Sequence, residues 1–399
     1  MTTLRLNTHI LRILLPLAVV LALLGGLALA LRPSSAAPIG ATLTVNEALT
    51  ANDATGFVRA TELRLFTFPA DHGPHGEYQT EWWYYTGNLD SADGRHWGFQ
   101  LTFFRRSLAA EPQQRDSNWA AENIYMAHFA LTDVGSNKFY AFDRFMRDGA
   151  GLAGAEAAPF HVWTGSWQAS GDPQTGTQLQ ASAENVAIDL VARSTKPPVL
   201  QGDNGLSQKS SGAGNASYYY SLTRMATEGT ITVDGTTYNV AGSTWKDREW
   251  STSVLEQDQV GWDWFALHLA DGRELMYYQI RKEDGSIEPL SSGTLVAADG
   301  STTRIARDNI QIEVLDRWPS PRSGAQYPSR WRVRVPKHTL DLAIEPYIAD
   351  QELPFSVTYW EGAVRVGGTS SGEPITGNGY IEMTGYSEQK RSAVENRSP

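Results

Sequence analysis

Carboxylates stand among aromatic side chains at three places in the chain, a combination that could support proton transfer in a site poor in water. The first place is YQTEWWYYTGNL, residues 78–89, in which five aromatic residues surround Glu81. Burial among large rings raises the pKa of a carboxyl group unless a cation pairs with it. Glu81 could therefore donate a proton, or Arg105 or Arg106 could neutralise it. The paired alternative is favoured, because buried carboxylates usually have a cationic partner.

The second place is GSTWKDREWSTS, residues 242–253. Side chains alternate between the two faces of a β-strand. A strand here would group Trp245, Asp247 and Glu249 on one face, and Lys246, Arg248 and Trp250 on the other. The alternating charges could belong to a solvated hairpin, but two tryptophans within six residues indicate a half-buried site.

The third place is GWDWFALHLADGRELMYYQIR, residues 261–281. On a strand, Asp263 lies in line there with Phe265, Leu267 and Leu269. A carboxylate in an apolar row is either paired inside a barrel or placed beside a ligand. Both alternatives stay open for Asp263.

Several classes of site and partner are excluded by what the chain lacks. It has no cysteine, which excludes disulfides, thiolate metal sites and a cysteine nucleophile. It has no G-x-S-x-G elbow, glycine-rich phosphate loop or H-E-x-x-H motif. His72 and His75 lie in a Gly/Pro loop and His128 is interpreted as a core histidine, so we expect neither a metal site nor another cofactor. A formal net charge of −11 without a basic stripe argues against a nucleic-acid partner.

The elements that must position these residues are β-strands. From about residue 58 onward, apolar and polar residues alternate with the period of a strand. Asp-Gly pairs at 93–94, 234–235, 271–272, 284–285 and 299–300 suit type I′ hairpin turns. So many antiparallel hairpins need closure to hide their edges, and about 330 residues exceed one eight-stranded barrel. We therefore predict an all-β fold of two tandem antiparallel barrels, residues 58–240 and 241–386.

The N-terminus predicts export. Arg5 and Arg12 precede an uncharged, mostly apolar run at residues 13–31, which is long for a signal peptide and short for a membrane span. Ala28-Leu29-Ala30 offers a cleavage site, so a cleaved signal peptide and a membrane anchor both stay open. The leading positive charges place the body outside the cytoplasm, periplasmic or on the extracytoplasmic face of the membrane. The predicted flanking segments are the signal or anchor at 1–32, a linker at 33–57 and a disordered tail at 387–399.

At these motifs the sequence resembles a known family, the carotenoid hydratase and AttH-type proteins built from two lipocalin-like barrels. The matching pieces are FPADHGPHGEYQTEWWYYTGNL, GFQLTFFRR, YMAHFALTD, SYYYSLTR, GSTWKDREWS, GWDWFALHLADGRELMYYQIR, YWEGAV and GYIEMTGY. They run in order from about residue 66 to residue 386. The resemblance is closer to the AttH-like branch, which is associated with ABC-transport gene clusters, than to the pigment hydratases.

The resemblance implies an apolar ligand between or inside the barrels and, for the hydratase members, addition of water across an isoprenoid C=C bond. In those members the acid-base machinery looks like an Asp-His-x-Trp segment that is followed by a Tyr-x-Asp segment. The corresponding segments here are Asp247-Arg248-Glu249-Trp250 and Tyr277-Tyr278-Gln279. Arginine cannot exchange a proton near neutral pH and glutamine is not an acid, so the two departures put that mechanism in doubt.

These observations lead to a set of predicted site residues and three alternative functions. The predicted catalytic residues are Asp247, Asp263, Glu249 and Tyr277; the predicted ligand-binding residues are Trp83, Tyr85, Trp245, Arg248, Trp250, Trp262, Trp264 and Gln279. The first function is an exported protein that encloses an apolar lipid or isoprenoid and works with an ABC transport system. The second is a hydro-lyase acting on an isoprenoid C=C bond. The third is a pair of barrels that serves only as an interaction surface for a transporter complex.

Overall fold

The computed structural model describes residues 54–111, 117–252, 255–256 and 258–387. The predicted signal or anchor at 1–32, nearly all of the predicted linker and the tail from residue 388 lie outside these ranges. Within the described ranges, no helix combines the length and the apolar character needed to cross a membrane.

The first half of the chain forms one antiparallel sheet with the strand order β4-β3-β2-β1-β13-β12-β9-β8-β7-β6-β5, to which β10 and β11 add by pairing with β12. Its strands are β1 (Thr80–Ser91), β2 (His96–Ser107), β3 (Asn123–Asp133), β4 (Lys138–Arg147), β5 (Ala153–Ala157), β6 (Phe160–Thr164), β7 (Trp167–Asp172), β8 (Gly176–Ala183), β9 (Val186–Ser194), β10 (Val199–Leu200), β11 (Leu206–Gln208), β12 (Ala216–Val233) and β13 (Thr236–Ser251). The long β12–β13 hairpin turns at Asp234 and Gly235, whose φ angles of 51° and 77° are those the Asp-Gly pair was expected to adopt.

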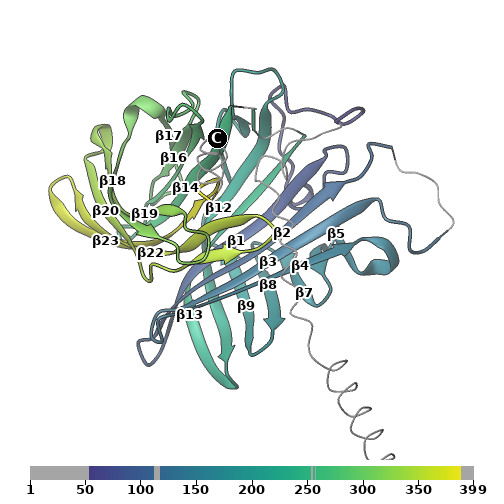
Figure 1. Cartoon of the computed structure of the whole chain (residues 1–399), viewed down its shortest axis with the longest axis horizontal. Coiled ribbons are helices and arrows are strands. Elements are labelled where there is room, and N and C mark those ends of the chain that lie inside the picture. Colours follow the sequence, from purple (N-terminus) through teal and green to yellow (C-terminus); the bar gives the residue numbers. More distant parts are fainter. Residues whose placement is uncertain (1–53, 112–116, 253–254, 257, 388–399) are drawn as a thin grey trace, which may run out of the picture. The chain divides into compact units, whose positions relative to one another are not determined.

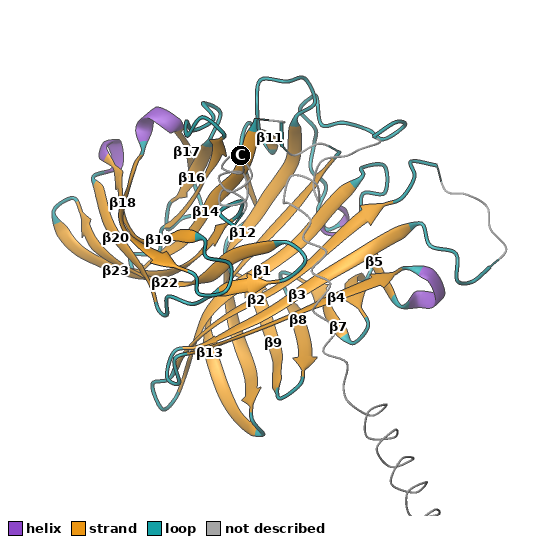
Figure 2. Ribbon diagram, viewed as in Figure 1, coloured by secondary structure: helices purple, strands orange, loops and turns teal. Residues whose placement is uncertain are grey.

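The second half forms another antiparallel sheet, in the order β17-β16-β15-β14-β23-β22-β20-β19-β18, with β21 paired to β22. Its strands are β14 (Gln259–Leu269), β15 (Glu274–Lys282), β16 (Ser292–Val296), β17 (Thr302–Ala306), β18 (Gln311–Pro319), β19 (Gln326–Val335), β20 (Leu340–Pro346), β21 (Glu352–Pro354), β22 (Thr358–Ser370) and β23 (Glu373–Met383). Short 3₁₀ turns are η1 (Ala70–His72), η2 (Gly149–Gly151), η3 (Arg307–Asn309) and η4 (Pro336–His338). Figure 2 shows strands throughout the described chain, which confirms the predicted all-β fold of two lipocalin-like units.

The change from the first sheet to the second falls later than the boundary predicted between residues 240 and 241. The whole of β13 up to Ser251 belongs to the first sheet, and the second sheet begins at Gln259. The reason is that residues 240–251 form ladder pairs with β1, from Val240 opposite Ser91 to Ser251 opposite Thr80. The segment GSTWKDREWS therefore completes the first unit rather than opening the second.

Each sheet curls around an apolar interior of its own (Figure 1). The two sheets meet where β1 contacts β23 and β2 contacts β22. A third apolar cluster, which includes Tyr84, Trp245 and Trp264, lies between the sheets. Strands at this junction are therefore buried on both faces, one toward a barrel interior and one toward the neighbouring sheet.

Candidate functional site

A cavity of about 410 Å³ lies between the two sheets. Its walls come from β1, β2, β3, β4, β12 and β13 of the first sheet, and from β14, β15, β22 and β23 of the second. The apolar and aromatic lining consists of Trp82, Tyr84, Phe104, Ile124, Met126, Phe145, Tyr219, Leu255, Trp262, Trp264, Tyr278, Ile280, Val357 and Tyr359. The ionisable lining consists of Glu81, Arg105, Arg106, His128, Lys209, Asp247, Glu249, Glu361 and Glu382. A space of this size and character is typical of a site for a small, mainly apolar ligand.

Strand alternation decides which predicted residues reach this cavity. On β13, Asp247 and Glu249 face it, as their shared strand face predicted. On β14, Trp262 and Trp264 line it. Trp245 belongs to the same apolar cluster between the sheets and contacts Asp247, but it is not part of the cavity lining.

Asp247 is held by three donors inside this wall. Its Oδ1 accepts hydrogen bonds from Ser221 Oγ at 2.5 Å and Trp245 Nε1 at 2.6 Å, and its Oδ2 accepts one from Tyr219 OH at 2.6 Å. Burial raises the pKa of Asp247 to about 7, although the three hydrogen bonds act in the opposite direction. The carboxyl group of Asp247 can thus carry a proton near neutral pH, but both of its oxygens already accept hydrogen bonds from these donors.

Glu249 forms a fixed ion pair beside Asp247. Lys209 Nζ lies 2.9 Å from its Oε1, and Ser217 Oγ donates to the same oxygen. Burial alone would lower the pKa of Lys209, but the Glu249 carboxylate outweighs it and the pKa is raised. Glu249 is therefore held in an ion pair with a charged lysine. Such a pair suits the positioning of neighbouring groups rather than proton transfer.

Two carboxyl groups that were not among the predicted site residues also face the cavity. Glu361 on β22 and Glu382 on β23 occupy its wall from the second sheet. Burial raises the pKa of Glu382 to about 8, even though Trp262 Nε1 donates to it at 3.0 Å. The pKa of Glu361 is raised well above its ordinary value by burial and then by Glu382. Both lie in the quoted motifs YWEGAV and GYIEMTGY, so a carboxylate within an apolar strand was the available signal.

Polar side chains of the first sheet surround Glu361. His128 Nδ1 is 2.6 Å from Tyr359 OH, and Gln100 Nε2 donates to the same hydroxyl at 3.2 Å. Burial lowers the pKa of His128 to about 3, so its ring is neutral. The prediction of a satisfied core histidine holds for burial and for Nδ1. Nε2, however, has no hydrogen-bond partner among the described residues, and the residue lines the cavity.

The structure places the remaining candidates of the second half away from the cavity. Asp263, Tyr277 and Gln279 point into the interior of the second unit, because they stand on the strand faces opposite Trp264 and Tyr278. Asp263 accepts hydrogen bonds there from Gln279 Nε2 at 2.8 Å and Tyr386 OH at 3.0 Å, and Arg281 Nε lies 3.2 Å away. Of the two alternatives for Asp263, the structure shows the paired carboxylate inside a barrel.

Four candidates of the first half lie in the interior of the first unit instead of the cavity. These are Trp83, Tyr85, Arg248 and Trp250, all of them fully buried. The guanidinium of Arg248 lies 4.0 Å from the ring centroid of Trp83, and its Nη2 donates to the carbonyl of Gly73 at 2.6 Å. Arg248 is therefore a structural cation at the end of the first barrel and does not contact the cavity.

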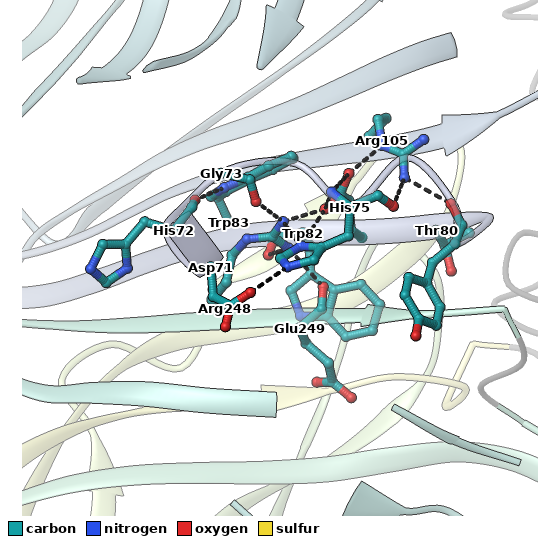
Figure 3. Close-up of polar contacts among 12 residues, drawn as sticks. Asp71, His72, Gly73, His75, Thr80, Trp82, Trp83, Arg105, Arg248 and Glu249 are labelled. Carbon is teal, nitrogen blue, oxygen red and sulfur yellow. Dashed lines mark hydrogen bonds and ion pairs between the residues drawn. The ribbon is translucent and has the colours of Figure 1, made fainter. Parts of the chain in front are cut away.

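Glu81 is the anionic centre of this barrel end, and Figure 3 labels its partners Arg105, His75 and Arg248. Its two oxygens accept hydrogen bonds from Arg105 and Arg248, and the backbone N–H of His75 donates to it at 3.0 Å. Burial by itself would raise the pKa of Glu81, but the two guanidinium groups outweigh it and the pKa falls below its ordinary value. The predicted pairing of Glu81 with Arg105 is confirmed, and Glu81 is not a proton donor even though it reaches the cavity edge.

Within the described ranges, no three His, Asp or Glu side chains are arranged so that they could hold a metal ion. The cavity supplies several side chains that could take part in chemistry. Those are three carboxyl groups whose pKa is raised by burial, a neutral imidazole and a wall of aromatic rings.

Comparison with known proteins shows which family and which solved structures this chain is similar to. The AttH-like family matches residues 59–386. A crystal structure of a protein assigned as AttH from Nitrosomonas europaea shares 34% sequence identity and a TM-score of 0.73, covering 83% of this chain and all of that one. Kievitone hydratase from Nectria haematococca has the same fold at 16% identity and a TM-score of 0.63, over 82% of this chain and 96% of that one.

A curated relative was also found. Dehydratase asqC from Emericella nidulans is 23% identical over 225 residues, which is 54% of this chain. The chain spans 62% of the length of that relative. The extent of the family match and the identity to the Nitrosomonas protein decide the assignment: this chain belongs to the AttH-like family.

Proposed function

We propose that the protein encloses a mainly hydrocarbon molecule in the cavity between its sheets and acts on it as a hydro-lyase, adding water to a C=C bond or removing water from an alcohol. The observation that carries the proposal is the coincidence of an aromatic cavity of about 410 Å³ with carboxyl groups whose pKa burial raises to neutrality or above. Cavities of this size hold small ligands with most of their surface buried.

The chemistry supports the same reaction class. Hydration begins when an acid protonates an alkene carbon, and dehydration begins when an acid protonates a hydroxyl group, so both need a carboxyl group that is protonated near neutral pH. Both directions pass through a carbocation, which aromatic faces stabilise as they do other cations. Trp82, Trp264 and Tyr359 line the same cavity as Glu361 and Glu382 and can supply such faces.

The departures at Arg248 and Gln279 weigh less against this reaction in the structure than they did in the sequence. Arg248 and Gln279 both point into barrel interiors, so neither would meet a molecule held between the sheets. Glu361 and Glu382 supply acids that the resemblance had not indicated. The names of two similar proteins, a hydratase and a dehydratase, support the same class of reaction.

A carrier function is the second candidate, because the greater part of the lining is apolar and would hold a ligand without transforming it. The third function, a pair of filled barrels that serves only as an interaction surface, receives no support from a molecule with such a cavity. Our proposal also includes export, with residues 13–31 as signal or anchor, and cooperation with an ABC transport system. These parts are supported by the N-terminal sequence and by the family resemblance, and cell fractionation with transporter co-purification tests them.

Solvent extraction of the purified protein, followed by mass spectrometry, tests the proposal. We expect an apolar molecule to be recovered. Incubation of the protein with nerolidol, a branched tertiary alcohol, is expected to give the dehydrated hydrocarbon. The reverse reaction is expected to incorporate oxygen from isotope-labelled water. Recovery of a ligand without turnover would favour the carrier, and failure to recover or bind any apolar molecule would contradict both functions.

A further inference from the structure

One wall of the cavity carries buried polar atoms that nothing in the described chain satisfies. They are Tyr84 OH, Gln100 Oε1, His128 Nε2 and both carboxyl oxygens of Glu361. All four residues line the cavity. We call this set the polar wall. Buried polar atoms in native proteins almost always have a partner, so several such atoms in residues that line one cavity point to a partner supplied from the cavity.

The polar wall is a single cluster rather than four separate defects. Tyr359 OH joins His128 Nδ1 at 2.6 Å to Gln100 Nε2 at 3.2 Å. Tyr84, Tyr359 and Gln100 lie close enough to Glu361 to lower its pKa, although none meets hydrogen-bond geometry with its oxygens. The other carboxyl groups of the cavity differ, because Asp247, Glu249 and Glu382 each accept a hydrogen bond from a neighbouring side chain.

We propose that the polar wall is a hydroxyl-binding subsite, and that the ligand of the cavity is an alcohol with a hydrocarbon body. This inference rests on the proposed function for the cavity and deepens it by naming the polar group of the ligand. In the hydro-lyase reaction the same subsite holds the hydroxyl group that leaves as water, or the water that is added.

The donors and acceptors of the polar wall match a hydroxyl group. Tyr84 OH and the protonated carboxyl of Glu361 donate, whereas Gln100 Oε1 accepts. His128 Nε2 also accepts when its ring proton is on Nδ1. A hydroxyl group both donates and accepts, so it can use both kinds of partner. A carbonyl group only accepts, and a hydrocarbon would leave every one of these atoms without a partner.

The charges near the polar wall make an anionic head group a poor alternative. The wall itself contains no cation, because His128 is neutral and Glu361 is an acid. A carboxylate or phosphate placed there would also stand beside Glu382. Of the cations that line the cavity, Lys209 forms an ion pair with Glu249 at 2.9 Å and Arg105 forms one with Glu81. Arg106 lies six residues along β2 from Gln100 of the polar wall.

The step that Glu361 would perform is balanced within the subsite. The Glu361 carboxyl donates its proton to the hydroxyl oxygen, the C–O bond breaks, and water leaves. The resulting carboxylate then takes a proton from the neighbouring carbon, whose C–H electron pair forms the C=C bond. Glu361 is protonated again at the end, and no other reactant is needed.

Binding of two probes with related skeletons tests the subsite. Nerolidol carries a hydroxyl group and farnesene is a hydrocarbon of the same skeleton. The full-length protein is titrated with each while tryptophan fluorescence is followed, since Trp82, Trp262 and Trp264 line the cavity. We expect nerolidol to bind about tenfold more tightly or better, because farnesene leaves buried polar atoms unpaired.

A matched pair of variants locates the hydroxyl group. Tyr84→Phe removes a buried, unpaired hydroxyl from the polar wall, whereas Tyr277→Phe removes one from the interior of the second unit. We expect Tyr84→Phe to reduce the preference for nerolidol about threefold to tenfold. Tyr277→Phe should leave it unchanged. Glu361→Leu, which removes both a donor and an acceptor, should reduce the preference further.

The outcomes separate this inference from the proposed function. If neither probe binds the wild-type protein, the proposed function fails and the subsite fails with it. If both bind equally well, the cavity binds apolar molecules but the hydroxyl subsite is contradicted. If nerolidol is preferred and the preference survives Tyr84→Phe and Glu361→Leu, the hydroxyl group binds elsewhere and the assignment of the polar wall is wrong.

Discussion

Glu361 on β22 and Glu382 on β23 lie directly opposite each other across an antiparallel ladder, and both face the cavity between the sheets. Like charges in directly opposed positions of a sheet repel each other. Burial is the main cause that raises the pKa of Glu382 to about 8 and that of Glu361 well above its ordinary value, and Glu382 raises the pKa of Glu361 further. This pair gives the cavity a carboxyl group whose raised pKa lets it hold a proton near neutral pH.

The opposed pair can be tested by removing one member. Glu382→Gln should lower the pKa of Glu361, because the Glu382 carboxylate is the largest influence on Glu361 after burial. Infrared spectra recorded between about pH 6 and about pH 10 would follow the C=O stretch of protonated carboxyl groups. We expect the highest-titrating band to move to lower pH in Glu382→Gln and to vanish in Glu361→Gln. A band that keeps its midpoint in Glu382→Gln would show that the two groups are not coupled.

Glu361 is expected to be the more important acid in turnover. If the protein dehydrates nerolidol, Glu361→Gln should lower kcat about 100-fold or more, which is the usual contribution of a general acid. Asp247→Asn should cost less, because the Asp247 oxygens are already occupied by three donors. Tyr277→Phe serves as the control, since its hydroxyl lies outside the cavity. Equal losses in the Glu361 and Asp247 variants would refute this ranking.

Asp247 should make folding stability depend on pH. Its pKa is about 7 in the folded protein and 3.8 as an unperturbed group, so the folded state binds more protons between these values. The stabilisation is complete below the lower value and is lost as the pH rises through about 7, by up to about 1.4 kcal/mol per pH unit. Urea unfolding of the wild type and Asp247→Asn at several pH values would measure this. We expect the wild type to lose stability relative to the variant as pH rises; a constant difference would argue against the raised pKa.

Lys246 is expected to reduce the stability of the first unit. It is fully buried, its Nζ has no hydrogen-bond partner in the part of the chain described, and it lies 4.6 Å from the ring centroid of Phe160. Burial and then Arg248 hold its pKa well below the ordinary value of 10.5. Lys246→Met keeps the length of the side chain and should raise the free energy of unfolding by about 1–3 kcal/mol at neutral pH.

The pH dependence of that gain has a definite sign. The unfolded chain keeps the lysine protonated up to about its ordinary pKa of 10.5, whereas the folded protein does not. Wild-type stability therefore rises with pH in this window, and the advantage of Lys246→Met should shrink. Urea unfolding at neutral and at alkaline pH would check both the gain and its trend. A destabilised methionine variant would show that the amine has a favourable role.

The ion cluster around Glu81 should be essential for stability. Glu81→Gln leaves Arg105 and Arg248 buried without their carboxylate, and breaking a buried pair in this way costs about 3–5 kcal/mol. The matched control is Asp341→Asn, which breaks the exposed pair with Arg332 and should cost about 1 kcal/mol or less. Denaturant unfolding at neutral pH would compare the two. Similar losses of unfolding free energy in both variants would mean that the buried cluster contributes no more to stability than the exposed pair.

Strand periodicity was enough to predict much of this molecule. The Asp-Gly turns and the alternating segments predicted two antiparallel units, and the alternation in GSTWKDREWSTS correctly grouped Asp247 with Glu249 and Arg248 with Trp250. The pairing of Glu81 with Arg105 followed from the rule that a buried carboxylate needs a cation. These features depend on neighbours within one strand or one hairpin, which is why the sequence alone determines them.

Which residues line the cavity is decided by the packing of the two sheets against each other. At their junction β1, β13 and β14 are buried on both faces, so the alternation of side chains could not tell the face toward a barrel interior from the face toward the cavity. For that reason Trp83, Asp263 and others were assigned to a site they do not reach. The opposition of Glu361 and Glu382 comes from the register of the β22–β23 ladder, and the polar wall from the docking of β22 onto β2 and β3. Contacts between separate sheets are set by the packing of whole surfaces, which no local pattern of residues encodes.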